Sequence, residues 1–168
     1  MKAKNLVLIG MPGAGKSTLG LLLAKKLGID FVDTDIIIQV NHGKTLQQII
    51  HDSGYQTLRQ YEQQVLLELK GSNQVIATGG SAVYCEAGMA YLKANGRLIF
   101  LDVDFQQLTQ RINDYHSRGI ARRAEQSFED LFAERRPLYQ QYADSCIDCN
   151  NLSIDQCLEA IIGKLSAD

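Results

Sequence analysis

The sequence predicts an α/β protein in which helices cover both faces of a parallel sheet, and three observations support this expectation. Short apolar runs alternate with segments of helical periodicity along the 168 residues. A phosphate-binding motif stands between the first apolar run and the first helical segment. The chain has only two prolines and shows no repeat, low-complexity tract or linker. Residues 1–168 are therefore expected to form a single domain.

The expected strands are short, and helical periodicity fills most of the intervals between them. Continuous apolar runs bounded by turn residues are typical of strands buried in a parallel sheet. In such sheets ligands bind at the carboxyl ends of the strands. The residues that follow each run are therefore the first candidates for a site. In chain order the runs are residues 6–9, 31–32, 75–77, 98–101 and, more weakly marked, 146–147.

The first apolar run leads into the most informative motif of the chain. Residues 10–17, Gly10-Met11-Pro12-Gly13-Ala14-Gly15-Lys16-Ser17, match the pattern G-x-x-x-x-G-K-[ST]. The glycines let backbone N–H groups turn inward, Lys16 adds a positive charge, and the helix that starts at Ser17 adds its positive dipole end. The motif predicts a nucleoside triphosphate site. A glycine-rich connection with an incidental lysine would leave its position between strand and helix unexplained.

Two helix starts are marked by capping residues. Thr45 before an apolar-periodic segment predicts a helix that Gly54 ends, and a second helix is expected over residues 55–70. These helices follow the second strand, so residues 33–70 are expected to project beyond the sheet as a substrate-binding insertion. Ser127 with Asp130 resembles a capping box and predicts another helix start. Residues 114–126, which show no period, are expected to form a lid over the phosphates.

Carboxylates and glycines follow the later strands. Asp33 and Asp35, two apart on a segment expected to be extended, are candidates for Mg²⁺ binding through water and for contact with a substrate hydroxyl. Helix capping is the alternative reading, although a cap requires only one of them. Asp102 ends an apolar run and is a rival metal ligand. Gly80 belongs to a Gly-Gly-Ser sequence that would let a ligand approach the backbone, or would merely form a tight turn.

Composition narrows the class of partner. The formal charge of −2 gives no general case for binding nucleic acid or an anionic membrane, and a small molecule is the expected partner. No apolar stretch is long enough for a signal peptide or a membrane span, so a cytoplasmic protein is expected. A monomer is the default. Cys146 and Cys149 form a C-x-x-C pair with no second pair to complete a zinc site, and partly buried thiols are the simpler reading.

Several motifs in this order and spacing resemble the shikimate kinase family across nearly the whole chain. They are residues 10–18, Asp33-Thr34-Asp35, Leu58-Arg59 with Glu62, Gly79-Gly80, and residues 134–139 followed by 142–144. The resemblance implies a five-stranded parallel sheet in the order 2-3-1-4-5, with a substrate-binding insertion and a lid. It also implies transfer of a phosphoryl group from ATP, with Mg²⁺, to a hydroxyl of a small carboxylated ring, with shikimate as the preferred acceptor.

The resemblance also assigns roles to individual residues. Ser17 would contact Mg²⁺, and Asp33 would hold the ion through water. Lys16 would reach the β and γ phosphates, and Asp35 would bind ring hydroxyls and orient the attacking one. On the acceptor side, Arg59 and Arg135 would hold the carboxylate, Gly80 would offer its backbone, and Glu62 would pair with the arginines. The backbone cradle for ATP comprises Gly13, Ala14, Gly15, Lys16, Ser17 and Thr18.

Three features depart from the family pattern. Leu58 replaces a phenylalanine, Ser81 replaces a third glycine, and residues 117–123 replace an Arg-Pro-Leu-Leu motif in the lid. Arg118 is the nearest match for the lid arginine that contacts ATP and assists catalysis, and Arg122 is the alternative. Because these positions touch the acceptor, a kinase for another hydroxy acid or polyol such as gluconate is retained as a second reading. A nucleotide-dependent switch is a weaker alternative, because the sequence shows no exposed apolar stripe or long charged tail for a partner protein. Single-stranded nucleic acid binding is weaker still, since no aromatic series accompanies the basic residues.

Overall fold

The computed structural model describes residues 4–112 and 119–166, which form a five-stranded sheet. Every neighbouring pair of strands is parallel. The order β2-β3-β1-β4-β5 confirms the arrangement that the family resemblance implies. The strands are β1 (Asn5–Ile9), β2 (Asp30–Asp33), β3 (Gln74–Ala77), β4 (Gly96–Asp102) and β5 (Ser145–Asp148).

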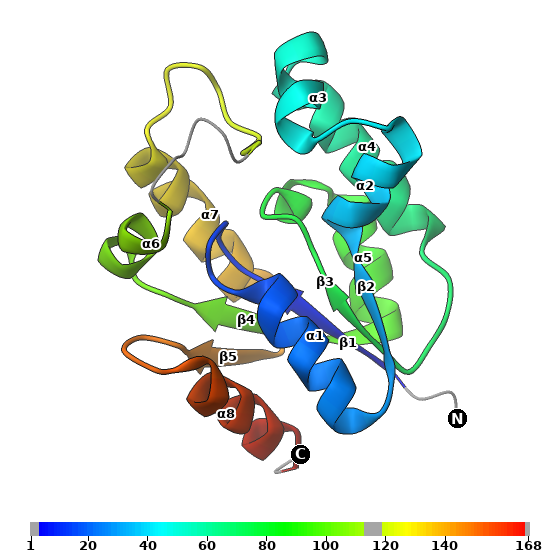
Figure 1. The fold of residues 1–168 in the computed structure, drawn as a ribbon, viewed down its shortest axis with the longest axis vertical. Helices are drawn as coiled ribbons and strands as arrows, with labels where there is room; N and C mark the ends of the chain where they lie inside the picture. Colours follow the sequence, from blue (N-terminus) through cyan, green and yellow to red (C-terminus); the bar gives the residue numbers. More distant parts are fainter. Residues whose placement is uncertain (1–3, 113–118, 167–168) are drawn as a thin grey trace.

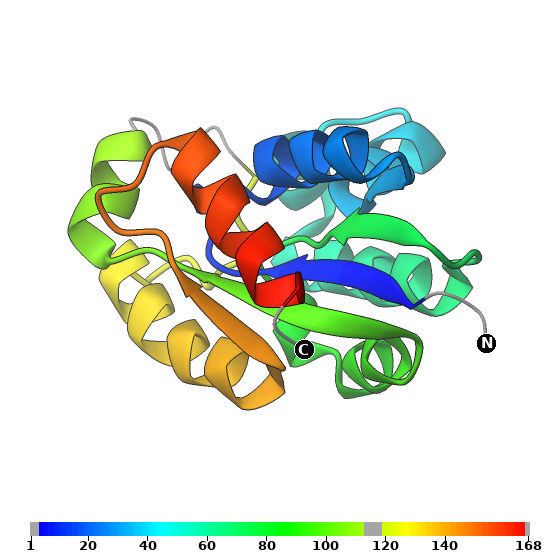
Figure 2. The ribbon, with the colours of Figure 1, turned by 90° about the horizontal axis from the view of Figure 1, so that it is seen from below.

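Helices cover both faces of the sheet, as the alternation of patterns predicts. Helices α1 (Lys16–Leu27) and α8 (Ile154–Ser166) lie on one face, and α5 (Glu86–Asn95) and α7 (Phe128–Tyr142) lie on the other (Figure 2). Three helices follow β2, namely α2 (Thr34–His42), α3 (Leu46–Ser53) and α4 (Tyr55–Glu68). A 3-10 helix η1 (Ala82–Tyr84) and the short α6 (Phe105–Arg111) complete the described elements, and neither was predicted from the sequence.

The central strands hold the core, and this explains why their sequences are apolar without alternation. Val7, Leu8 and Ile9 of β1 are completely buried, because helices cover the strand on both sides. The edge strand β5 instead alternates, with Cys146 exposed and Ile147 buried. Alternation at the sheet edge makes the fifth strand the least visible one in the sequence.

The predicted helix starts are confirmed by their capping bonds. Thr45 and Gln48 form a reciprocal capping box at α3, and Gly54 ends that helix. Ser127 and Asp130 form another box at α7. One prediction was wrong, because Asp33 and Asp35 do not share an extended segment. Asp33 ends β2 and caps α2, so Asp35 lies in the first turn of that helix.

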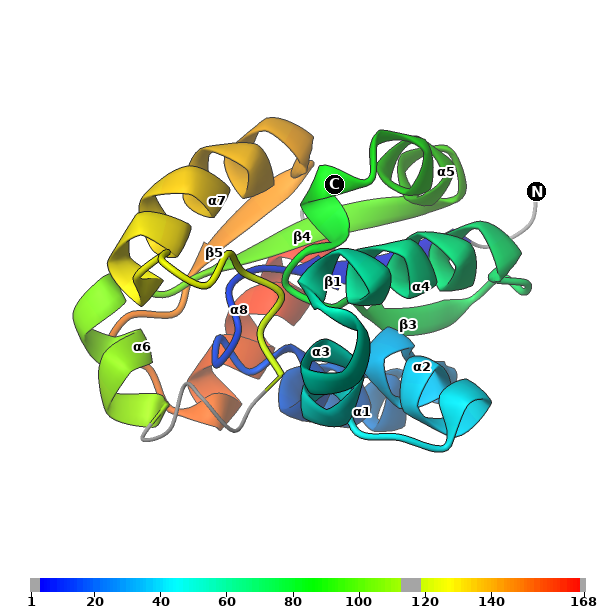
Figure 3. The same ribbon diagram turned by 90° about the horizontal axis from the view of Figure 1, so that it is seen from above.

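Two arms flank the loop that follows β1. Helices α2 and α3 rise on one side of it, and the segment between Gly119 and α7 crosses toward α3 from the other side (Figures 1 and 3). No helix within the described ranges is long and apolar enough to cross a membrane. The arrangement places the insertion and the end of the expected lid on opposite sides of the P-loop.

Candidate active site

A cavity of about 420 Å³ lies at the carboxyl ends of β1, β2 and β3, and its volume is typical of small-molecule sites. The loop after β1 forms one wall, and residues 78–81 after β3 form another. Asp35, Glu62, Arg111 and Arg135 bring charged side chains to it from four different helices. The lid segment 119–121 closes part of the remaining side. Most of the predicted site residues therefore meet in one place.

The P-loop has the backbone conformation that anion binding requires. Gly13 and Gly15 have φ values of 83° and 97°, in the region that only glycine enters readily. Helix α1 starts after Gly15 with no side-chain cap and no acidic residue in its first turn. The N-terminus of the helix therefore has no capping side chain, which leaves its first N–H groups and its dipole available to an anion. Thr18, in the first turn of α1, also lines the cavity.

Lys16 is held inside the loop by carbonyl oxygens. Its Nζ donates hydrogen bonds to the oxygens of Gly10 and Met11 at 2.7 and 2.9 Å. Burial lowers the pKa of Lys16 to about 8, although Asp35 opposes this by favouring the charged form. A desolvated ammonium group held at a helix start is suited to a phosphate anion.

Ser17 and Asp33 form a close pair beside the P-loop. Ser17 Oγ donates to Asp33 Oδ2 at 2.6 Å, and Asp33 Oδ1 accepts from the backbone N–H groups of Asp35 and Ile36. Asp33 therefore acts as a helix cap and also holds Ser17, so the capping reading and the metal reading do not exclude each other. A hydroxyl with one nearby carboxylate fits Mg²⁺, which keeps most of its waters and takes oxygen ligands from phosphates.

The rival metal ligand Asp102 is engaged elsewhere. Arg136 Nε and Nη2 donate to its two carboxylate oxygens at 3.0 and 2.7 Å. This bidentate pair joins the end of β4 to α7 and neutralises the carboxylate. Among the described residues, no group of three or more acidic, histidine or cysteine side chains could hold a metal without help from a ligand.

Two buried carboxylates lie on the opposite side of the cavity. Burial, followed by the charge of Asp33, raises the pKa of Asp35 to about 6. Burial, followed by the charge of Asp35, raises the pKa of Glu62 to about 7. Ser81 Oγ donates a hydrogen bond to Glu62 Oε2. The residue that replaces the family's third glycine is therefore the one that holds Glu62.

Position 79 requires a glycine because the carboxylates of Glu62 and Asp35 lie against its backbone. A Cβ atom at this position would lie 2.1 Å from Glu62 Oε1 and 2.7 Å from Asp35 Oδ1. The close approach predicted from the Gly-Gly sequence is thus used by two carboxylates of the protein itself. A Cβ at Gly80 would lie 2.9 Å from both Arg135 Nη1 and Pro12 Cδ. The two glycines let the turn after β3 pass close to Pro12 of the P-loop and to the charged side chains Glu62, Asp35 and Arg135.

The two arginines of the acceptor side lie in different environments. Arg135 is 1% exposed, lines the cavity, and donates from Nη2 to the carbonyl oxygen of Ala121 at 2.6 Å. Arg59 is half-buried and lies outside the cavity lining, with its Cζ 3.9 Å from the ring centre of Tyr84. The expected pairing with Glu62 is met only at longer range, because Arg135 lowers the pKa of Glu62 while Ser81 makes the hydrogen bond.

The described end of the segment expected to form a lid contacts helix α3 of the expected insertion. The Gly119 N–H donates to Gln47 Oε1 at 3.0 Å, and Gly119 has a φ of 65°. Arg122 lies outside the cavity lining and donates from Nη1 to the carbonyl oxygen of Gln126. Arg118, the first choice for the lid arginine, lies outside the described residues. Arg111 of α6 also lines the cavity.

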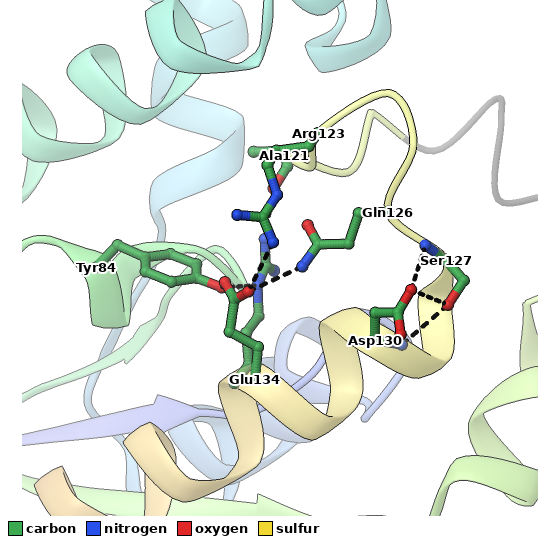
Figure 4. Close-up of polar contacts among 8 residues, drawn as sticks. Tyr84, Ala121, Arg123, Gln126, Ser127, Asp130 and Glu134 are labelled. Atoms are coloured by element: carbon green, nitrogen blue, oxygen red, sulfur yellow. Dashed lines mark hydrogen bonds and ion pairs between the residues drawn. The ribbon is translucent and has the colours of Figure 1, made fainter.

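Behind the cavity, a cluster around Glu134 joins the lid to α7. Glu134 accepts hydrogen bonds from Tyr84, Arg123 and Gln126, which Figure 4 shows converging on its carboxylate. Tyr84 comes from η1, directly after the Gly-Gly-Ser turn. Sequence reasoning missed Tyr84, and its only signal was an aromatic residue three positions beyond Ser81.

The cysteines lie away from this site. The four are free thiols, and Cys146 is exposed while Cys149 of the same C-x-x-C is buried. Cys85 caps α5, since its sulfur accepts a hydrogen bond from the Gly88 N–H. Their positions agree with a structural role.

A parallel sheet with a P-loop on one wall of a pocket, and carboxylates and a buried arginine on the other, is the architecture of P-loop kinases that act on small molecules. The shikimate kinase family model matches residues 12–166. The chain belongs to the shikimate kinase family.

Relatives and solved structures agree with this assignment over nearly the full length. Shikimate kinase from Thermodesulfovibrio yellowstonii is 36% identical over 162 residues, covering 95% of this chain and 93% of the relative. Shikimate kinase from Francisella tularensis subsp. novicida is 32% identical and covers 99% and 94%. The structure of shikimate kinase from Acinetobacter baumannii in complex with shikimate superimposes with a TM-score of 0.90 at 31% identity, covering 98% of this chain and 94% of the other.

Proposed function

We propose that this protein transfers the γ-phosphoryl group of ATP to a hydroxyl of shikimate, giving shikimate 3-phosphate. The observation that carries the proposal is the meeting of two half-sites in one cavity. Lys16 and the start of α1 form the donor half, and Asp35 and Arg135 form the acceptor half. Their proximity allows a hydroxyl to approach the terminal phosphate directly, which is the geometric requirement of phosphoryl transfer.

On the donor side, the P-loop residues 13–18 would cradle the phosphates with backbone N–H groups. Lys16 would exchange its bonds to Gly10 and Met11 for bonds to the β and γ phosphates. Ser17 would contact Mg²⁺, and Asp33 would hold the ion through water from its present position against Ser17. When bound, Mg²⁺ supplies neutralisation of phosphate charge.

On the acceptor side, Asp35 would accept a hydrogen bond from the attacking hydroxyl and orient it. Its pKa of about 6 leaves it ionised at neutral pH yet basic enough to share a proton. Arg135 and Arg59 would bind the carboxylate of the acid, and Gly80 would offer its backbone. The Nε–H of Arg59 is buried, and no acceptor among the described residues faces it. A buried donor of this kind is costly unless a ligand pairs with it.

We assign the substrate-binding insertion to residues 33–70 and the lid to residues 114–126. A lid arginine, Arg118 or Arg122, would complete the charge around the transferred group. Lid closure would exclude water that could otherwise accept the phosphoryl group. The chain contains both half-sites within one copy, which supports a monomer, and its net charge of −2 supports a small-molecule substrate rather than a nucleic acid or membrane partner. We propose a cytoplasmic location, as the sequence led us to expect.

The test is a panel of acceptors at fixed ATP and Mg²⁺, with ADP formation followed by a coupled assay and the product identified by ³¹P NMR. We expect shikimate to be phosphorylated at least about 100-fold more efficiently than gluconate, because a rigid ring holds its carboxylate and its hydroxyl at a fixed separation, whereas the acyclic chain of gluconate must lose conformational freedom to present both groups. Absence of transfer to shikimate would overturn the proposal. Transfer to gluconate alone would identify a sugar-acid kinase, and nucleotide binding without any phosphorylated acceptor would identify a switch.

A further inference from the structure

One tyrosine contacts both arginines of the acceptor side. Arg59 Cζ lies 3.9 Å from the centre of the Tyr84 ring, and Arg135 Cζ lies 5.3 Å from it. Arg135 Nε also donates a hydrogen bond to Tyr84 Oη at 3.4 Å. Both guanidinium groups therefore lie against one aromatic ring, although they come from different helices, α4 and α7. An aromatic face attracts a cation, and here it offsets part of the repulsion between the two groups.

The phenol of Tyr84 has a second partner that fixes its direction. Its O–H donates to Glu134 Oε1 while its oxygen accepts from Arg135, so both hydrogen-bonding roles of the hydroxyl are used. Burial and the bond to Glu134 raise the pKa of Tyr84, so the group keeps its proton at neutral pH. Glu134 is held in turn by Arg123 and Gln126 (Figure 4). These hydrogen bonds therefore fix the position of the Tyr84 ring through residues that do not line the cavity.

The stacking of Arg59 leaves its hydrogen-bonding groups available. Its guanidinium lies over the ring of Tyr84, and its Cζ is 5.2 Å from the centre of the Tyr55 ring. A ring against the face of a guanidinium leaves the N–H groups at the edge of that group free to donate hydrogen bonds to a carboxylate. Its buried Nε has no acceptor among the described residues. In Arg135, by contrast, Nη2 already donates a hydrogen bond to the carbonyl oxygen of Ala121, and Nε donates one to the Tyr84 hydroxyl. Within residues 4–112 and 119–166, no carboxylate lies at hydrogen-bond distance from either guanidinium, although the charges of Arg59 and Glu134 interact.

We propose that Tyr84 is a positioning residue for acid recognition, which holds Arg59 and Arg135 in the arrangement that binds the carboxylate of the acceptor. The proposal rests on the proposed function, since it concerns the acid that the kinase phosphorylates. Tyr84 is not among the residues that line the cavity. Its effect should therefore fall on the affinity for the carboxylate and leave the donor half unchanged.

The experiment compares shikimate with its carboxamide, which keeps the ring and hydroxyls but lacks the negative charge. Binding is measured by titration calorimetry, and kcat and KM are measured where turnover is seen. Tyr84→Phe keeps the ring and removes the bonds to Glu134 and Arg135, whereas Tyr84→Leu removes the aromatic face as well. Tyr91→Phe is the matched control, because the Tyr91 hydroxyl donates a hydrogen bond to the carbonyl oxygen of Leu69 at the end of α4, and neither residue lines the cavity.

We expect Tyr84→Phe to weaken shikimate binding about fivefold and Tyr84→Leu about thirtyfold. The affinity for the carboxamide and the KM for ATP should stay within about twofold, since neither depends on the arginine pair. A purely structural role would instead weaken shikimate and carboxamide binding equally. If wild type prefers shikimate and both Tyr84 variants keep that preference, the role of Tyr84 is overturned while the kinase function stands. If wild type binds neither compound, the proposed function fails and this proposal fails with it.

Discussion

The donor half and the acceptor half of the cavity are built in opposite ways. The donor half comes from one continuous segment, residues 10–18, and relies on backbone N–H groups, a helix start and one lysine. The acceptor half is assembled from side chains on α2, α4, the turn after β3 and α7. The first half follows from local conformation. The second requires the whole sheet to bring its parts together, and it is where this chain departs from the family pattern.

The largest effect is expected on the donor side. Lys16→Ala should reduce kcat/KM by about a thousandfold or more for every acceptor, because the charge that stabilises the transferring phosphate is lost. Steady-state kinetics with a coupled ADP assay measures it, and circular dichroism checks that the fold is kept. Lys25→Ala, in the exposed last turn of the same helix, is the control. A loss confined to one acceptor would contradict the separation of the halves.

The next effect should distinguish the acceptor side from the donor side. Asp35→Asn should reduce kcat by about 100- to 1,000-fold while ATP affinity changes little, because the amide cannot accept the proton of the hydroxyl. The raised pKa of Asp35, about 6, also predicts that wild-type activity falls below that pH as the carboxylate is protonated. A pH profile of kcat/KM for both proteins tests this, with Asp30→Asn at the exposed start of β2 as control. An unchanged acid limb in Asp35→Asn would remove Asp35 from this role.

A third prediction concerns the free energy of unfolding, which burial of the Glu62 carboxylate should lower at neutral pH. In the folded protein Glu62 binds its proton more tightly than in the unfolded chain, since its pKa rises from 4.5 to about 7. Below about pH 4.5 Glu62 is protonated in both states, so its ionisation does not affect the free energy of unfolding. As the pH rises from about 4.5 to about 7, the unfolded chain ionises more readily than the folded protein, and the free energy of unfolding falls by about 3 kcal/mol.

Glu62→Gln removes this ionisation, so it should raise the free energy of unfolding at pH 8 and leave it nearly unchanged at pH 4.5. Urea denaturation at the two pH values measures the difference. Glu68→Gln, on the exposed end of the same helix, should change neither value. Equal effects of Glu62→Gln at both pH values would show that burial does not penalise the charge.

The smallest effect is expected where the lid meets the insertion. Gln47→Ala removes the hydrogen bond to the Gly119 N–H and should raise the KM for shikimate about two- to tenfold, since a single such bond contributes about 0.5–1.5 kcal/mol. The KM for ATP should change less if this contact between Gln47 and Gly119, the lid seat, belongs to the acceptor side. Kinetics with Gln60→Ala, an exposed residue of α4, provides the comparison. A larger change in the KM for ATP would place the seat on the donor side instead.

Local patterns predicted much of the fold because their physical causes are local. Caps at Thr45 and Ser127 depend on bonds within four residues, and the strand β1 is apolar because both of its faces are buried. The α6 helix and η1 escaped prediction because each is a short turn stabilised by the elements around it. The error over Asp33 and Asp35 has the same origin, since the strand stops at the residue that caps the next helix.

The sequence by itself determined the donor half, because a P-loop is a conformation of consecutive residues and glycines, a lysine and a helix start suffice to specify it. It also determined which residues were candidates for the acceptor half. Only the tertiary structure decided how those candidates meet. It brought Ser81 to hydrogen-bond distance of Glu62 and Arg136 to that of Asp102. It also placed the ring of Tyr84 against Arg59 and Arg135. Such contacts join residues 19 to 51 positions apart, and their distances depend on how strands and helices pack rather than on any local preference.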